Sequence, residues 1–410
     1  MVEENKKSVL LINIYYGTGG NSGLYLHEIL ECLNNKGYHT VNFVNSKYLF
    51  LETQKNCEII ATMLKYSNFI EKKIPCLPRI FIKIISFLNL FFDYLYILNY
   101  IKKNISGVDC IIVNYSLVDR LKITLNFLKR IKMIPNVTVL LTPHETQSFH
   151  VDKIQQLFSV KLKVFFEIPD GFVIHNNSSR KQLMDFGINE SQKIYCHPFP
   201  LMDLQKISRA TSPPSSNEAK ISFLFIGFLR IEKGVDLLIH VWKKIGNKYN
   251  NVHLIIAGEA PLGLKYNFDE LHNFTFINKF VDDDTYIKLI EESHYVLLPY
   301  RQCTNSGVLS TVFSLGRPVL CSDIDTFKNF KFINSEYLFK SGNEDSLYDL
   351  FEYIIHNHQT VYQNYINTIL KEKKIYHENF KMQVIETYNK IIKDNCPREI
   401  TEKQNNMADD

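Results

Sequence analysis

The sequence lacks paired cysteines, a large excess of charge of either sign, and any long uninterrupted apolar run. Its eight cysteines are scattered, with no CxxC pair and no metal-ligand spacing, which is typical of a protein from a reducing compartment. A formal net charge of +4 does not by itself indicate nucleic-acid binding. Residues 1–7 show no signal-peptide pattern, so we expect a cytoplasmic location.

The most apolar stretch, residues 74–103, falls short of a membrane span. Lys83, Asn89 and Asp93 interrupt the roughly 20 apolar residues that a spanning helix needs. The stretch is also rich in aromatic residues and has basic residues on both flanks. Two interpretations remain open: a helix packed in the N-terminal domain, and a helix lying on an anionic membrane surface. Both hold if one face of the helix is in the core and the other is on lipid.

A regular alternation of strand and helix patterns runs along the chain. Short apolar runs without a helical stripe, such as residues 8–14 and 221–226, predict buried parallel strands. A Pro- and Ser-rich stretch, residues 205–219, predicts a linker between two domains, as the chain length also suggests. We therefore predict an α/β protein in which two Rossmann-like αβα domains face a central cleft. The expected parts are domains over 1–204 and 220–375, a helix over 376–396 that packs back on the first domain, and a disordered tail over 397–410.

The loop after the strand at residues 221–226 places two cations in front of a helix. Arg230 and Lys233 lie between Gly227, where the strand pattern breaks, and Gly234, where an amphipathic helix pattern begins. Open α/β sheets bind ligands at the carboxyl ends of their strands, where backbone N–H groups and the helix dipole favour anions. The loop therefore predicts a phosphate-type anion site. The alternative is an ordinary loop with solvated cations.

Two further loops of the second half are expected on the same side of the sheet. Gly258 and Glu259 follow a strand pattern, and Asn305, Ser306 and Gly307 open a helix whose N–H groups would add to an anion site. An Arg, a Lys and a helix N-terminus together suit a diphosphate and can neutralise it without a metal ion. We therefore expect no metal and no cofactor.

An acidic run, residues 282–284, has the appearance of a DxD metal motif. Because it directly precedes a helix pattern that begins at Thr285, we interpret it as N-capping and as first-turn charge that complements the helix dipole. The expected cap is Asp284.

In the first half, two loops are candidates for ligand contacts. Residues 17–23 are rich in glycine but do not form GxGxxG, so they predict either a close approach of ligand to backbone or a plain turn. His144 and Glu145 follow the strand pattern at residues 137–142, which makes His144 a candidate general base or substrate contact. A structural hydrogen bond of this histidine is the alternative.

These motifs, in this order and spacing, resemble those of GT-B glycosyltransferases, closest to the large family 4-like group (glycosyltransferase group 1) that uses nucleoside-diphosphate sugars. The resemblance covers most of the chain. It is carried by residues 227–234 (GFLRIEKG, similar to the family's G-x-x-x-x-x-K-G loop), 255–259 (IIAGE), 296–299 (VLLP), 316–319 (GRPV) and 170–175 (DGFVIH).

The resemblance implies a role for each matching position. Arg230 and Lys233 would contact the diphosphate and stabilise the charge of the leaving group, and His144 would lie near the reacting sugar, with Glu145 on the acceptor side. The implied donor contacts are Gly19 and Gly20 from the first domain, Ser306 and Gly307 at the distal phosphate, and Gly258 and Phe280 near base and ribose. Glu259 and Asn305 are further donor-binding candidates.

One departure from the family pattern is clear. The family's E-x7-E element is degenerate, because its glutamate positions fall on Cys303 and Thr311. The second glutamate normally holds the ribose of the donor. Its loss leaves the donor base and the retention of anomeric configuration unassigned, and the loop at residues 300–302 is a candidate for substitute contacts.

The leading hypothesis is a bacterial enzyme that transfers a sugar from a nucleoside-diphosphate donor to a glycan or lipid-linked glycan in cell-surface polysaccharide biosynthesis. It would work in the cytoplasm or peripherally on the inner face of the cell membrane. A sugar-nucleotide epimerase on the same fold would need cleft carboxylates beyond Glu145 and Glu259. A catalytically degenerate subunit that binds a partner or a glycan is the third hypothesis; the missing glutamates favour it, whereas Arg230 and Lys233 speak against it.

Overall fold

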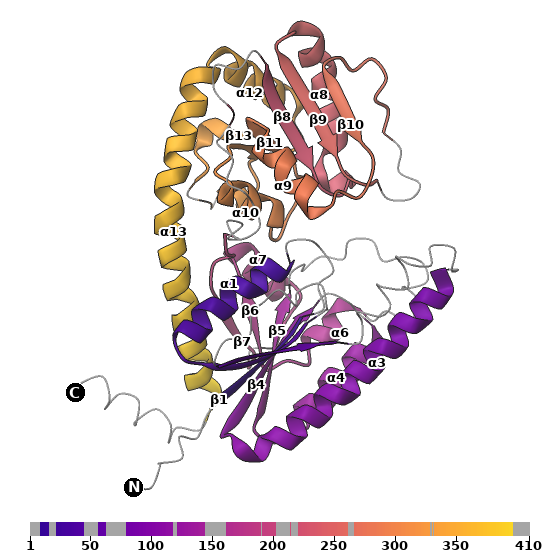
Figure 1. Ribbon diagram of the computed structural model, residues 1–410, viewed down its shortest axis with the longest axis vertical. Helices are drawn as coiled ribbons and strands as arrows, with labels where there is room; N and C mark the ends of the chain where they lie inside the picture. Colours follow the sequence, from indigo (N-terminus) through magenta and orange to yellow (C-terminus); the bar gives the residue numbers. More distant parts are fainter. Residues whose placement is uncertain are drawn as a thin grey trace, which may run out of the picture. The chain divides into compact units, whose positions relative to one another are not determined.

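The chain divides into two compact units in a computed structural model (Figure 1). Unit 1 comprises Met1–Pro198 and Phe380–Asp410, and unit 2 comprises Phe199–Asn379. The structure describes residues 9–15, 22–44, 56–62, 79–117, 121–143, 161–189, 191–201, 214, 220–260, 266–328, 330 and 332–396.

Unit 1 is built on a seven-stranded parallel sheet with the strand order β3-β2-β1-β4-β5-β6-β7. The order reverses between β1 and β4, which are hydrogen-bonded neighbours. The central strands are buried on both faces, so they read as continuous apolar runs in the sequence. The strands are β1 (Val9–Tyr15), β2 (His39–Val44), β3 (Cys57–Ala61), β4 (Cys110–Leu117), β5 (Val137–Pro143), β6 (Gly171–Ile174) and β7 (Lys193–Cys196).

Helices cover both faces of this sheet, with α3 and α4 together on one side and α1 on the other (Figure 1). They are α1 (Ser22–Asn35), α3 (Arg79–Asn104) with the 3-10 turn η2 (Ile105–Gly107), α4 (Lys122–Lys132), α6 (Leu162–Phe166) and α7 (Asn177–Asp185). The end of the last helix, α13 (His358–Asn395), also packs in unit 1: Thr387 donates a hydrogen bond to the carbonyl of Cys196 at 3.0 Å.

A disulfide joins Cys110 at the start of β4 to Cys396, just after α13. The scattered cysteines gave no indication of this bond, because 286 residues separate its two partners. It ties the C-terminal end of the last helix to the central part of the unit 1 sheet.

Unit 2 contains a six-stranded parallel sheet with the order β10-β9-β8-β11-β12-β13. Its core is strongly aromatic: the ring of Phe223 on β8 contacts Trp242, Tyr295 and Phe351. The strands are β8 (Ile221–Ile226), β9 (Val252–Ala257), β10 (Phe274–Ile277), β11 (Tyr295–Leu298), β12 (Val319–Ser322) and β13 (Leu338–Phe339). The helices are α8 (Val235–Lys248), α9 (Asp283–Glu291), α10 (Gly307–Ser314), α11 (Asp325–Lys328), α12 (Glu344–His356) and the first part of α13, with the 3-10 turns η3 (Ile231–Lys233) and η4 (Ser335–Tyr337).

The α/β class and the two parallel sheets confirm the prediction made from the alternating pattern. The last helix differs from it, because α13 is a continuous helix of 38 residues that begins at His358 rather than near residue 376. Its middle, around Lys371 and Lys374, exposes charged side chains and breaks the apolar stripe. The predicted tail over 397–410 lies outside the described residues, as does the predicted linker over 205–219 apart from Pro214.

Candidate functional site

The loop between β8 and α8 is held in one conformation by its neighbours in unit 2. The backbone N–H of Leu229 donates to the carbonyl of Glu259 at 3.0 Å, and the Tyr266 hydroxyl donates to the carbonyl of Leu229 at 3.2 Å. The chain then makes the 3-10 turn η3 and enters α8 through Gly234, whose φ of 69° lies in the left-handed region. Arg230 and Lys233 therefore project from a backbone fixed at both ends.

Gly234 also brings this loop against the end of β11. A Cβ atom at position 234 would lie 1.9 Å from the carbonyl oxygen of Pro299, so only glycine fits the approach of the two backbones. Beside this contact, the Lys233 ammonium lies over the Tyr300 ring, 3.7 Å from its centroid. Such a cation–π contact restrains the lysine while leaving its positive charge in place.

Arg230 stands at the start of the turn and is about one-third exposed, at 29% of its side chain. Its guanidinium lies 3.7 Å from the carboxylate of Glu232 and 5.5 Å from the centroid of the Phe228 ring. The Glu232 side chain is buried, whereas Phe228 is 51% exposed. The arginine is thus oriented by a buried carboxylate and an aromatic ring, and part of it faces solvent.

A bidentate ion pair closes the loop from the β11 side. Arg301 donates to both carboxylate oxygens of Asp236 at 2.8 and 2.7 Å, and also to the carbonyl of Ile231 at 2.5 Å. Burial disfavours the charged form of Asp236, but the hydrogen bonds and charge of Arg301 outweigh it, so the pKa of this carboxyl is lowered. Arg301 belongs to the loop at residues 300–302, which was a candidate for substitute ribose contacts. Its guanidinium is bound to Asp236 and to the Ile231 carbonyl, where it fixes the turn that carries Lys233.

The loop after β9 lies next to the β8 loop. Gly258 has a φ of 151°, and a Cβ there would lie 1.8 Å from the carbonyl oxygen of Gly227. Glu259 is exposed, and so is Phe280, at 59%, in the segment after β10. Gly258 and Glu259 therefore border the β8 loop directly, whereas Phe280 presents an exposed ring from the loop before α9.

The third loop follows β11 and leads into α10. Ser306 is the N-cap of this helix, and its hydroxyl oxygen accepts a hydrogen bond from the backbone N–H of Leu309 at 3.1 Å. Asn305 precedes the cap and Gly307 is the first helical residue, and both are partly buried. The N-terminus of α10 is thus well formed and lies on the same loop as Tyr300.

The two positions aligned with the missing glutamates are filled by side chains that bond to nearby backbone. Thr311 is fully buried on α10 and donates to the carbonyl of Gly307 at 2.9 Å. Cys303 donates to the carbonyl of Asn305 at 3.0 Å. Both therefore stabilise the loop and the first turn of α10.

These three loops come from neighbouring strands, since β9, β8 and β11 are adjacent in the sheet. All their strands are parallel, so the loops meet at one edge, and the strand order reverses between β8 and β11. Ligands of open α/β sheets bind at such a reversal. Arg230, Lys233 and the α10 N-terminus are placed at this edge, which makes it the candidate site for a phosphate-bearing anion.

The other predicted contacts lie outside the described residues: Gly19 and Gly20 in the glycine-rich loop, and His144 and Glu145 after β5. The acidic run before α9 has the expected capping role, but the cap is Asp282, which accepts from the N–H of Thr285 at 2.9 Å, and not Asp284. The difference arises because the helix begins two residues earlier than its apolar pattern. Among the residues that the structure describes, no group of three or more His, Cys, Asp or Glu side chains is placed to hold a metal ion.

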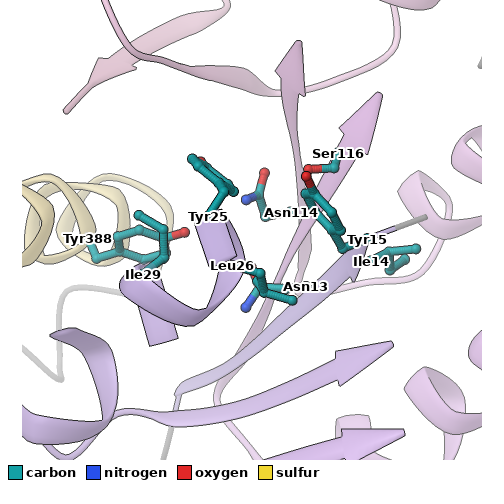
Figure 2. Close-up of a pocket in the computed structure, with 9 residues that line it drawn as sticks. All are labelled: Asn13, Ile14, Tyr15, Tyr25, Leu26, Ile29, Asn114, Ser116 and Tyr388. Atoms are coloured by element: carbon teal, nitrogen blue, oxygen red, sulfur yellow. The ribbon is translucent and has the colours of Figure 1, made fainter. Parts of the chain in front are cut away.

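Unit 1 has its own polar pocket, at the reversal between β1 and β4 (Figure 2). The Asn114 side chain on β4 accepts a hydrogen bond from Thr142 at 2.8 Å and also hydrogen-bonds Tyr388 of α13. Tyr25 of α1 and Ser116 of β4 line the pocket beside them. The sequence patterns did not predict this pocket. An asparagine within an apolar strand pattern, at residue 114, was the available signal.

Comparisons with known proteins place the second unit in a family. Residues 220–357 match the sequence model of the family described as glycosyl transferases group 1. An uncharacterized glycosyltransferase of Methanocaldococcus jannaschii is 25% identical over 194 residues. That alignment takes in 44% of this chain and 46% of the relative, so the chain spans about half the length of the curated relative that it matches.

Solved structures resemble the chain over nearly its whole length. Sucrose-phosphate synthase from Thermosynechococcus elongatus has a TM-score of 0.61 at 14% identity, over 94% of this chain and 99% of that chain. HepE of Anabaena, in complex with UDP and glucose, has a TM-score of 0.59 at 13% identity, over 95% and 100%. The catalytic domain of starch synthase IV from Arabidopsis thaliana, bound to ADP and acarbose, has a TM-score of 0.60 at 10% identity, over 92% and 99%.

The two α/β units therefore have the GT-B fold. Residues 220–357 of the second unit match the family model of glycosyl transferases group 1. The loops described above, which carry Arg230, Lys233, Gly258 and Ser306, all lie within these residues.

Proposed function

We propose that the protein is a glycosyltransferase that moves a sugar from a nucleoside-diphosphate donor to a glycan or lipid-linked glycan. The observation that carries the proposal is the placement of Arg230, Lys233 and the α10 N-terminus at the strand reversal of the family-matched domain. Two of the similar solved structures were determined with UDP or ADP bound, which supports a nucleotide donor.

The reaction needs stabilisation of a leaving nucleoside diphosphate. The bond from the anomeric carbon to the distal phosphate oxygen breaks and takes its electron pair to the phosphate. The acceptor oxygen forms the new bond to the anomeric carbon, and the proton of the acceptor hydroxyl passes to the released phosphate or to solvent. Negative charge builds up on the distal phosphate, where fixed cations and N–H groups lower the barrier most. We assign Arg230 and Lys233 to this charge and the N–H groups at Ser306 and Gly307 to the distal phosphate. This set supplies the neutralisation without a metal ion.

The remaining assignments follow the family resemblance. We propose that His144 lies near the reacting sugar with Glu145 on the acceptor side, and that Gly19 and Gly20 face the diphosphate. Gly258, Glu259, Asn305 and Phe280 would complete the donor site. Cell-surface polysaccharide biosynthesis in a bacterium, in the cytoplasm or on the inner membrane face, is the setting that we propose for this activity.

The test is turnover of radiolabelled nucleoside-diphosphate sugars by the purified chain, with products identified by mass. Arg230→Ala and Lys233→Ala should each lower turnover roughly a hundredfold or more, because each removes a cation from the developing charge. Lys288→Ala is the matched control: this lysine is 71% exposed on α9 and pairs with Glu292 one helical turn away, so its loss should leave turnover unchanged. Added EDTA should also leave turnover unchanged.

Two results would change the conclusion. Full activity of either loop variant would contradict the site assignment. A chain that no nucleoside diphosphate stabilises in a thermal-shift assay would instead be the degenerate binding subunit. Conversion of the donor to its epimer, with no transfer, would identify the epimerase.

A further inference from the structure

Helix α3 has one face in the core of unit 1 and one face in solvent. On the inner face, Leu90, Ile97 and Ile101 are buried in the hydrophobic core. Tyr94 stacks on Phe127 of α4 with ring centroids 4.0 Å apart, and its hydroxyl hydrogen-bonds the hydroxyls of Tyr115 and Thr124 at 2.9 and 2.8 Å. These contacts hold α3 along the side of the sheet.

The outer face of α3 is apolar. Of the seventeen large hydrophobic side chains that are exposed among the described residues, eight lie on this one helix between residues 81 and 96, and five of the eight are aromatic. At about 100° per residue, the eight positions cover about half of the helix circumference. They are Phe81, Ile84, Phe87, Leu88, Phe91, Phe92, Leu95 and Tyr96, each between 41% and 54% exposed. Because scattered exposed hydrophobics are normal but a continuous patch is not, this face needs a partner.

The charge around this face is basic. Helices α3 and α4, which pack on each other, carry four Lys or Arg residues each. Their single acidic residue is Asp93, which is buried. Lys102 and Lys103 are exposed in the last turn of α3, and on the helix wheel both lie on the same side as the apolar face, beyond its C-terminal end. Aromatic side chains beside lysines suit the boundary between lipid headgroups and acyl chains.

We propose that the outer face of α3 docks on the surface of a bilayer that contains anionic lipid. The segment Ile84–Gly107 is long and apolar enough to cross a membrane, and the mean hydropathy of its most apolar part is 1.5. However, 39% of that part is buried in the protein. Crossing would remove Leu90, Tyr94, Ile97 and Ile101 from the core, whereas docking keeps them in place. The helix therefore lies on the lipid surface with its apolar half inserted.

A second copy of the chain fits the face less well. A two-helix contact uses a narrow stripe, whereas the apolar face of α3 covers about half the helix. A symmetric contact would also bring a second basic surface against Lys102 and Lys103. The docking is inferred from the surface of α3 and does not depend on the proposed function. Only the further idea that docking brings a lipid-linked acceptor to the enzyme rests on the proposed function.

The test is flotation of the full chain with vesicles of phosphatidylcholine, with and without phosphatidylglycerol, at low and high salt. The chain should float with the anionic vesicles at low salt and less at high salt. Phe91→Ser with Leu95→Ser should lower partitioning more than about tenfold by removing inserted apolar area. Lys102→Gln with Lys103→Gln should lower it about fivefold for each lysine, or about thirtyfold in all.

The matched control is Leu370→Ser with Met382→Ser, which removes from α13 two apolar side chains that are more exposed than Phe91 and Leu95, at 60% and 55% against 41% each. It should float like the unaltered chain, and all variants should keep the same melting curve by circular dichroism. Absence of flotation with anionic vesicles, or equal loss in the control, overturns the proposal. So does a dimer in sedimentation that only the Phe91 and Leu95 changes dissociate. Flotation without sugar transfer would overturn the proposed function and leave the docking intact. Transfer to a soluble glycan without flotation would overturn the docking and leave the proposed function intact.

Discussion

Replacing Gly234 by alanine should damage both the stability of unit 2 and its anion site. Two effects add. A φ of 69° places an L-residue in the left-handed region, at about 1–2 kcal/mol. The new Cβ would also lie 1.9 Å from the carbonyl oxygen of Pro299, and the backbone shift that relieves such overpacking adds roughly 1–3 kcal/mol. We expect a loss of roughly 2–5 kcal/mol in the free energy of unfolding.

Gly342→Ala separates the two effects. Gly342 lies in the same unit with a φ of 73°, but a Cβ at that position would meet nothing within 4 Å. Its replacement should lower the free energy of unfolding by no more than about 1–2 kcal/mol, because only the left-handed backbone is penalised. The two variants should therefore differ by roughly 1–3 kcal/mol.

Urea unfolding followed by tryptophan fluorescence measures the difference in the correct unit. The chain has one tryptophan, Trp242, which is fully buried on α8 in unit 2. Nucleoside-diphosphate affinity is the second measurement: it should fall for Gly234→Ala, since Lys233 moves with the turn, and stay unchanged for Gly342→Ala. Equal unfolding free energies for the two variants would refute the close approach of the β8 and β11 loops.

Two more predictions follow from contacts in the two units. Asp236→Ala removes the partner that holds Arg301 against the turn. Because both side chains are partly exposed, the free energy of unfolding should change by less than about 1 kcal/mol. Nucleoside-diphosphate affinity, measured by calorimetry, should fall several-fold. Glu352→Ala, which breaks the Lys248 pair at the other end of α8, should leave that affinity unchanged, and equal affinities in both variants would contradict the role of Arg301. Burial lowers the pKa of His197 to about 4 from 6.5, so the unfolded chain binds more protons between these values and stability falls as pH drops from 6.5 towards 4. The loss should reach about 3 kcal/mol in unit 1, and His197→Gln should flatten the pH profile of unfolding; an unchanged profile would show that another group titrates.

The sequence was most informative where a signal is local. The apolar run of β8, the two cations and Gly234 lie within a few residues, so the loop and its place at a strand end could be read directly. Anion binding by this loop stays a prediction. Strand β3 could not be read in this way. At the sheet edge its residues after Cys57 are exposed or half-buried, and they lack the apolar run of a buried strand. The start of α13 was not predicted for a similar reason: exposed charged residues interrupt the apolar stripe of this helix.

Contacts between distant residues account for most of the rest. Asp236 and Arg301 are 65 residues apart, and each looks like an ordinary surface residue in its own segment. Only the adjacency of β8 and β11 makes them a pair and shows that Arg301 supports the turn from inside the protein. The apolar face of α3 is the intermediate case: its composition indicated two environments, and the structure determined which residues belong to each.

The division of unit 1 into two segments affects the order in which the two units can complete their folding during synthesis. Unit 2 is continuous in the chain, so a ribosome finishes it before it reaches Phe380. Unit 1 can complete its core only after α13 has been synthesised. Val384, Tyr388 and Ile391 of α13 are buried, and Thr387 of α13 hydrogen-bonds β7. The half that is synthesised first is thus the half that is completed last. A premature stop just after Asn379 would therefore harm the N-terminal sheet and leave unit 2 complete.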